Sequence, residues 1–106
     1  MLLLNALANV AAGQTDAAVI AAVAGKQIKV VQISFIPGGT ATNVTFNSKG
    51  SGAGTAISPL FAAGANGQVT LPFSEKGWFT TNTGEGLSVT TGAGATVGIL
   101  VGYELV

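Results

Sequence analysis

Turn-forming residues interrupt this chain so often that no long regular element fits between them. Runs rich in Val, Ile, Thr and Phe are each stopped within about ten residues by Gly, Asn, Ser or Pro. Glycine alone provides 16 of the 106 residues. Short runs with these residue types favour β-strands joined by turns. We therefore predict an all-β fold: a single antiparallel β-sandwich, jelly-roll-like, with about eight short strands.

The strand pattern recurs along most of the chain, in residues 16–24, 28–36, 43–47, 57–62, 68–73, 78–79, 87–91 and 95–106. In residues 28–36, simple alternation places Val31, Ile33 and Phe35 on one face and Val30 on the other. In residues 43–47, alternation places Val44 and Phe46 inward. In residues 95–106, one face is apolar and the other is rich in glycine, which predicts a strand in the middle of a sheet. The apolar face carries Val97, Ile99, Val101, Tyr103 and Leu105, and the other carries Gly98, Leu100 and Gly102. Residues 49–56 contain mostly Gly, Ser and Ala and predict a long mobile loop.

The length of the chain fits one domain with one hydrophobic core. We divide it into an apolar N-terminal arm or first strand, residues 1–14, and a β-sandwich domain, residues 15–106. The opening MLLLNALANV lacks the basic residues that precede the apolar part of a secretion signal. Two interpretations stay open for it. It packs as a strand or a helical turn on its own domain, or it is an arm that buries Leu2, Leu3, Leu4 and Leu7 against a neighbouring subunit.

Charged residues make up only 8% of the chain, against roughly 25% in an average domain. Four lysines, no arginine and four carboxylates cannot form the basic stripe that a nucleic acid requires. Histidine and cysteine are absent, which removes two common metal ligands, and no apolar stretch is long enough to span a membrane as a helix. We expect no nucleic acid, membrane, metal or cofactor as partner. A weakly charged, neutral surface promotes association, so a homo-oligomer is expected.

Catalytic arrangements are weakly represented in the sequence. Ser74 and Lys76 lie two residues apart in a turn, and Glu75 and Glu85 would form a carboxylate pair only if their flanking strands met. The segment 50–55, GSGAGT, lacks the Lys-Ser/Thr ending of a phosphate-binding loop. We therefore expect no catalytic residue and no enzymatic activity.

The dipeptide Trp78-Phe79 places two large rings on opposite sides of one strand, so that only one ring faces the core. The candidate protein interface accordingly comprises Leu2, Leu3, Leu4, Leu7, Trp78 and Phe79. A second interpretation is a sugar site, with Trp78 as a flat platform and the amide of Asn82 beside it. A buried or interfacial ring is the more common use of a single tryptophan in a small sandwich.

From residue 17 onward the chain also resembles a known group of proteins. The segments AAVAGKQIKVVQ, ANGQVTLPFSEKGWF, TGEGLSV and VGILVGYELV, in this order, resemble small structural proteins of tailed bacteriophages. The resemblance extends in particular to capsid decoration (cement) proteins, and it rests on style and strand order over most of the chain. It implies a small β-sandwich that forms a trimer on the outer capsid surface of the virion, assembled in the host cytoplasm. It also implies that this trimer binds the major capsid protein or other virion subunits and stabilises the shell.

The resemblance leaves other functions open. A tail, fibre-base or capsid-spike subunit shares the same features, and a carbohydrate-binding β-module is the alternative from a different functional class.

Overall fold

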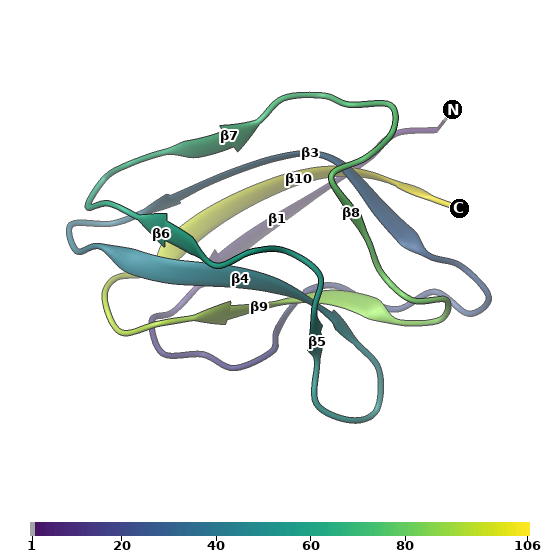
Figure 1. The fold of residues 1–106 in the computed structure, drawn as a ribbon, viewed down its shortest axis with the longest axis horizontal. Coiled ribbons are helices and arrows are strands. Elements are labelled where there is room, and N and C mark those ends of the chain that lie inside the picture. The colour runs from purple at the N-terminus through teal and green to yellow at the C-terminus, as the bar shows by residue number, and fades with distance from the viewer. Residues whose placement is uncertain (1) are drawn as a thin grey trace.

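The computed structural model describes residues 2–106, which form two five-stranded antiparallel β-sheets packed face to face (Figure 1). The strands are β1 (Leu4–Val10), β2 (Ala17–Ile20), β3 (Ile28–Pro37), β4 (Thr42–Lys49), β5 (Thr55–Ala56), β6 (Phe61–Ala63), β7 (Val69–Leu71), β8 (Phe79–Thr80), β9 (Gly86–Thr91) and β10 (Val97–Leu105). The predicted all-β antiparallel sandwich is confirmed. It has ten strands instead of about eight, because β1 and β5 add to those expected.

The first sheet has the order β1-β10-β3-β7, with β8 pairing beside β7 on the same edge of β3. The second sheet has the order β2-β9-β4-β5, with β6 on the same edge of β4. Strand β10 therefore lies between β1 and β3, as its glycine-rich second face predicted. No helix that could span a membrane occurs among residues 2–106.

The core lies between the sheets and is centred on aromatic rings. Phe35 of β3 and Phe46 of β4 are completely buried, and their centroids are 5.5 Å apart in an edge-to-face arrangement. The alternation predicted for β4 is confirmed, since Val44 and Phe46 face inward. The inward positions of β10 are Val97, Ile99 and Val101, also as predicted.

Strand β3 departs from simple alternation. Gln32 pairs with Gly102, but Val30 pairs with Tyr103, so Val31 is an extra residue that forms a β-bulge. The bulge turns Val30 toward the core, where it joins Ile33, while Val31 is buried outside the core cluster. The prediction that Val30 lies on the face opposite Ile33 is therefore wrong.

The loop predicted over residues 49–56 is only partly a loop. Residues 50–54 form a turn, and β5 then pairs with β4 at Asn47 and Ser48. The segment 16–24 is a strand only as far as Ile20, and the edge strand expected at 57–62 forms at 61–63. These boundary shifts leave the order of the elements unchanged.

Candidate functional site

The outer side of the first sheet is the most distinctive surface of the molecule. Because side chains alternate along a strand, every second residue of β1, β10, β3 and β7 points away from the core. We call this surface the leucine face, and it comprises Asn5, Leu7, Asn9, Gln32, Ser34, Ile36, Thr70, Gly98, Leu100 and Gly102. None of these residues carries a charge.

The strand register arranges these residues in rows across the sheet. Leu7 lies opposite Leu100, which lies opposite Ser34. Leu7 is 78% exposed and Leu100 is 46% exposed, and Ile36 in the next row is 43% exposed. Three aliphatic side chains on three adjacent strands thus meet solvent side by side, bordered by amides and hydroxyls.

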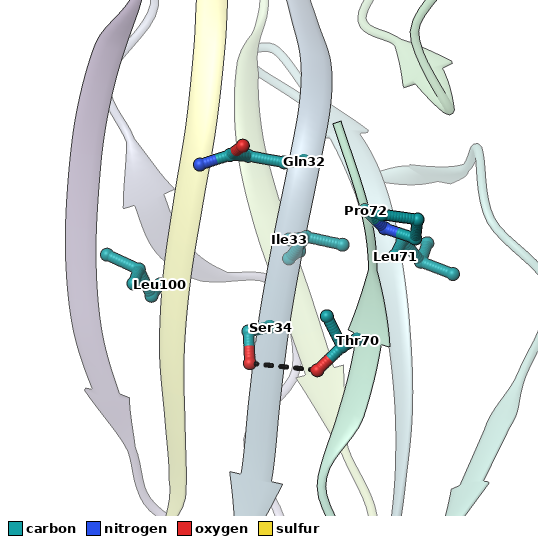
Figure 2. Close-up of a pocket in the computed structure, with 7 residues that line it drawn as sticks. All are labelled: Gln32, Ile33, Ser34, Thr70, Leu71, Pro72 and Leu100. Carbon is teal, nitrogen blue, oxygen red and sulfur yellow. Dashed lines mark hydrogen bonds between the residues drawn. The ribbon is translucent and has the colours of Figure 1, made fainter. Parts of the chain in front are cut away.

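Glycine keeps the centre of the leucine face flat. Gly102 has no side chain, and Gln32 of β3 extends over it across β10 (Figure 2). A Cβ atom at Gly102 would lie 2.5 Å from Cγ of Gln32, so the two side chains could not both occupy this position. Beside Gln32 is a shallow hollow of about 180 Å³, lined among others by Ser34, Thr70 and Leu100.

Hydroxyl and amide groups border the hollow on the β7 side. The Nε2 group of Gln68 donates to Oγ of Ser34 and to Oγ1 of Thr70, at 2.8 Å in both cases. The two hydroxyl oxygens are 3.4 Å apart (Figure 2). These side chains hold one another in place and present a fixed polar rim next to Leu100.

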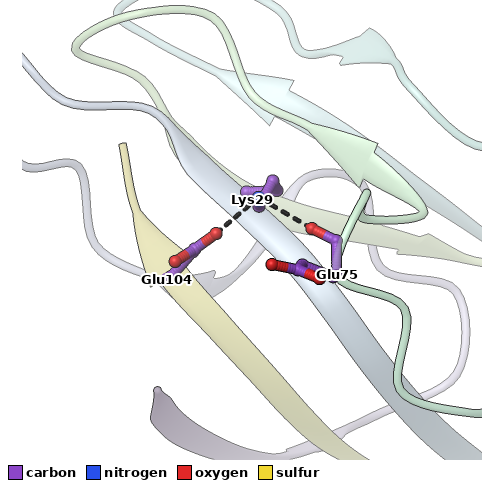
Figure 3. A network of polar contacts seen from close by, with 3 residues as sticks. All are labelled: Lys29, Glu75 and Glu104. Atoms are coloured by element: carbon purple, nitrogen blue, oxygen red, sulfur yellow. Dashed lines mark hydrogen bonds and ion pairs between the residues drawn. The ribbon is translucent and has the colours of Figure 1, made fainter. Parts of the chain in front are cut away.

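The charged residues on the strands of the first sheet are Lys29 and Glu104, which lie together at one end. Lys29 of β3 forms an ion pair with Glu104 of β10, its registered neighbour, and its Nζ donates to the main-chain oxygen of Glu75 at 3.0 Å (Figure 3). The side chains of Lys29 and Glu104 are only 20% and 12% exposed. The two opposite charges of this half-buried pair cancel each other.

Strand β1 forms one edge of the first sheet. Within residues 2–106 it pairs on one side only, with β10, along its full length from Leu4 to Val10. Native proteins usually protect such an edge with a charge, a proline or a bulge. Strand β1 has none of these three. Its unpaired backbone groups are a template for another strand.

The structure separates the leucines of the N-terminal segment. Leu4 is half-buried at the start of β1, whereas Leu2 and Leu7 are 74% and 78% exposed and Leu3 is also exposed. Residues 4–10 thus belong to the sandwich as β1, and three of the four leucines predicted as interface residues meet solvent.

The two neighbouring rings have different positions, as the alternation predicted. Phe79 is only 9% exposed and stacks on Phe46, with centroids 5.5 Å apart and an interplanar angle of 20°. It belongs to the core and is not available as an interface residue. Trp78 is 44% exposed, and its Nε1 donates to the main-chain oxygen of Pro72 at 2.7 Å. Phe73, in the same loop, is exposed as well.

The outer side of the second sheet is polar. Asp16 precedes β2 and has a φ of 51°, a backbone conformation that Asp tolerates better than most residues. Its carboxylate accepts hydrogen bonds from Asn47 at 3.1 Å, from Ser88 at 3.2 Å and from the main-chain N–H of Gly54 at 2.9 Å. This network joins the segment before β2 to β4, to β9 and to the turn before β5, and it provides an acceptor for the buried amide of Asn47.

The residues considered for catalysis, Glu75 and Glu85, do not form a carboxylate pair. The carboxylate of Glu85 accepts from Ser48 at 2.7 Å and from Asn82 at 3.2 Å, at the end of the core, whereas Glu75 contacts Lys29 through its main chain. Every buried side-chain nitrogen or oxygen in residues 2–106 has a hydrogen-bond partner.

Sequence reasoning missed Leu100 and Ile36 as surface residues. The alternation of β10 had already placed Leu100 between Gly98 and Gly102 on the second face of a central strand, which was the available signal. The sequence did not predict the register that brings Leu7, from the other end of the chain, beside Leu100.

No protein-family model, curated protein or solved structure matches the chain.

Proposed function

We propose that this protein is a structural virion subunit that decorates the outer surface of a phage capsid by binding the major capsid protein through the leucine face. The protein acts by adhesion and performs no chemical reaction. The observation that carries the proposal is the neutral outer side of the first sheet, on which Leu7, Leu100 and Ile36 lie exposed on adjacent strands.

A surface of this kind fits a partner that stays bound. Adjacent exposed aliphatic side chains gain free energy when they are covered, at roughly 25 cal/mol for each Å² of apolar area. The hydroxyls and amides around them can form hydrogen bonds at the rim of an interface, which is the usual arrangement in protein complexes. The backbone of this surface is already ordered by strand pairing, so little backbone entropy is lost on binding.

The capsid is the partner suggested by the resemblance to decoration proteins, and the composition agrees with it. A glycine-rich chain with a small core gains stability from any partner that binds only its folded form. A subunit that spans adjacent capsid proteins would in turn brace the shell. Since the leucine face is neutral, the affinity should depend little on salt concentration.

The direct test is binding to capsid shells that lack the protein. We expect the purified chain to co-sediment with such shells and to raise their rupture temperature. Leu100→Lys places a charge at the centre of the leucine face and should weaken binding by about tenfold, the equivalent of about 1.4 kcal/mol. The matched control is Asn43→Lys, which adds the same charge at an exposed position on the other sheet and should bind normally.

Two outcomes would reject the proposal. If the wild-type protein does not bind shells, capsid decoration is wrong. The same assay with isolated tails then tests whether the protein is a tail subunit. If Leu100→Lys and Asn43→Lys bind shells equally well, the leucine face is not the docking surface.

A carbohydrate-binding module is the second candidate, favoured by the exposed ring of Trp78. Two observations weaken it. The indole N–H already donates to Pro72, and the side-chain amide of Asn82 already donates to Glu85. Retention of the wild-type protein on a polysaccharide column, lost in Trp78→Ala, would support this function in place of capsid decoration.

A further inference from the structure

The sequence of the free edge strand is nearly symmetrical about its central residue. Strand β1 reads Leu-Asn-Ala-Leu-Ala-Asn-Val, so that Leu7 is flanked by alanines, then by asparagines, then by Leu4 and Val10. Two copies of such a strand, placed antiparallel, present matching residues to each other. The strand is also regular, and only its β10 side is paired within residues 2–106.

We propose that β1 pairs with β1 of a second copy of this chain, antiparallel and centred on Leu7. In this register Leu7 faces Leu7 of the second copy, each Asn5 faces Asn9, each Ala6 faces Ala8, and Leu4 faces Val10. The contact is isologous, because the same residues contribute from both subunits around a twofold axis. This inference concerns the edge of the sheet and does not depend on the capsid as partner.

Backbone geometry supports the pairing. The seven residue pairs alternate between hydrogen-bonded and non-hydrogen-bonded positions, so the two strands would share roughly six to eight N–H···O=C bonds. The first sheets of both subunits would then form one continuous sheet. On its outer side, Leu100 and Leu7 of one subunit would lie in one row with Leu7 and Leu100 of its partner.

Side-chain chemistry permits this contact and favours its register. An antiparallel contact between identical strands brings like charges together when the strand is charged. Residues 2–15 contain no charged side chain, so no repulsion arises. The facing asparagines can exchange hydrogen bonds between their amides, since each amide has both a donor and an acceptor. A shift by two residues would place Leu7 opposite an asparagine and lose this match.

An isologous contact has a consequence for the oligomeric state. A twofold contact produces dimers, or larger assemblies with an even number of subunits if another surface also takes part. A trimer, the state implied by the resemblance to decoration proteins, would require a different surface and could coexist with β1 pairing only in a hexamer or a larger closed assembly with an even number of subunits. The number of subunits in solution is therefore informative.

The test uses single cysteines, because the wild-type chain contains none. In the proposed register the Cα atoms of the two Leu7 residues lie about 4.5–5.5 Å apart, within the range of a disulfide. Leu7→Cys should therefore form a covalent dimer on mild oxidation. Asn5→Cys alone should not, because Asn5 of the second copy lies four residues away along the strand, at about 13 Å.

A mixture of Asn5→Cys and Asn9→Cys should form the covalent heterodimer, which fixes both the direction and the register. The control is Asn43→Cys on the second sheet. Pairing of β1 should make Leu7→Cys crosslink at least about tenfold faster than this control, since it raises the effective thiol concentration. Light scattering of the wild-type protein should give an even number of subunits.

Crosslinking of Leu7→Cys at the rate of Asn43→Cys would overturn the proposal, as would a trimeric or monomeric wild-type protein. Faster crosslinking of Asn5→Cys with itself than of Leu7→Cys would also overturn it, because the register would be different. Since none of these measurements involves capsid shells, a failure here leaves the proposed capsid binding to be judged by its own assay.

Discussion

Leu7 of β1 lies directly opposite Leu100 of β10, and the two side chains share the outer side of the first sheet although they are 93 positions apart in the sequence (100 − 7). Both are exposed, so neither contributes much to the core. The fold does not require apolar residues at these two positions, which is consistent with the proposed docking surface. They can also be changed without unfolding the domain, which makes the following predictions testable.

Opposite charges at residue 7 should control pairing of β1. Leu7→Lys and Leu7→Glu each place like charges opposite each other across the twofold axis, and each variant alone should be monomeric. A mixture of the two should restore the dimer, because Lys then faces Glu. Sedimentation velocity measures this, and circular dichroism checks that both variants fold. Dimers of either variant alone, at the same concentration, would contradict the prediction.

The neighbouring rings Trp78 and Phe79 should differ sharply in their contribution to stability. Phe79→Ala removes a ring stacked on Phe46 in the core and should lower the free energy of unfolding by about 3 kcal/mol. The Tm should fall by about 10 °C or more. Trp78→Ala removes a half-exposed ring and one hydrogen bond, and should cost about 1 kcal/mol. Calorimetry of both variants tests this order, and equal losses would contradict it.

Gly86 should not tolerate even a methyl group. A Cβ atom there would lie 2.6 Å from the main-chain oxygen of Ile20 and 3.0 Å from the main-chain nitrogen of Ala22, and a backbone cannot move away as a side chain can. We expect Gly86→Ala to destabilise the protein by about 1–3 kcal/mol. Gly52→Ala is the control, because its Cβ would have no neighbour within 4 Å. Urea unfolding should show a change of less than about 0.5 kcal/mol for the control. If both variants have the same free energy of unfolding as the wild type, Gly86 does not lie this close to the main chain of Ile20 and Ala22.

Asp16 should stabilise the fold through its three hydrogen-bond donors. Asp16→Ala leaves Asn47, Ser88 and the N–H of Gly54 without this acceptor, and we expect a loss of about 1–3 kcal/mol. Asp16→Asn keeps one acceptor oxygen and tolerates the positive φ, so its loss should be smaller. Urea unfolding of the two variants provides the comparison. A larger loss for Asn than for Ala would show that the carboxylate contacts do not stabilise the fold.

Much of the sandwich could be predicted because alternation is a local property. The inward faces of β4 and β10 follow from the spacing of Val44, Phe46, Val97, Ile99 and Val101 alone. The position of β10 between two strands was also predicted, because one face of this strand is apolar and the other is rich in glycine. These features require no knowledge of which strand lies next to which.

The features that could not be predicted depend on pairing between distant segments. The β-bulge at Val31 arises from the register between β3 and β10, and it moves Val30 to the opposite face from the one alternation gives. The hydrogen bonds of the Asp16 carboxylate join segments 31 to 72 residues apart. The leucine face likewise needs β1 beside β10, so the sequence indicated Leu7 as a surface residue but missed Leu100.

The position of β10 between β1 and β3 affects how the protein must be made. A ribosome releases β1 and β3 first, and neither can form its native pairing with β10 until residues 97–105 have emerged. During that interval the nascent chain exposes apolar strands, among them a symmetrical segment able to pair with the same segment of a neighbouring nascent chain. Synthesis rate and chaperone supply should therefore influence the yield of folded protein more than the small size of the domain suggests.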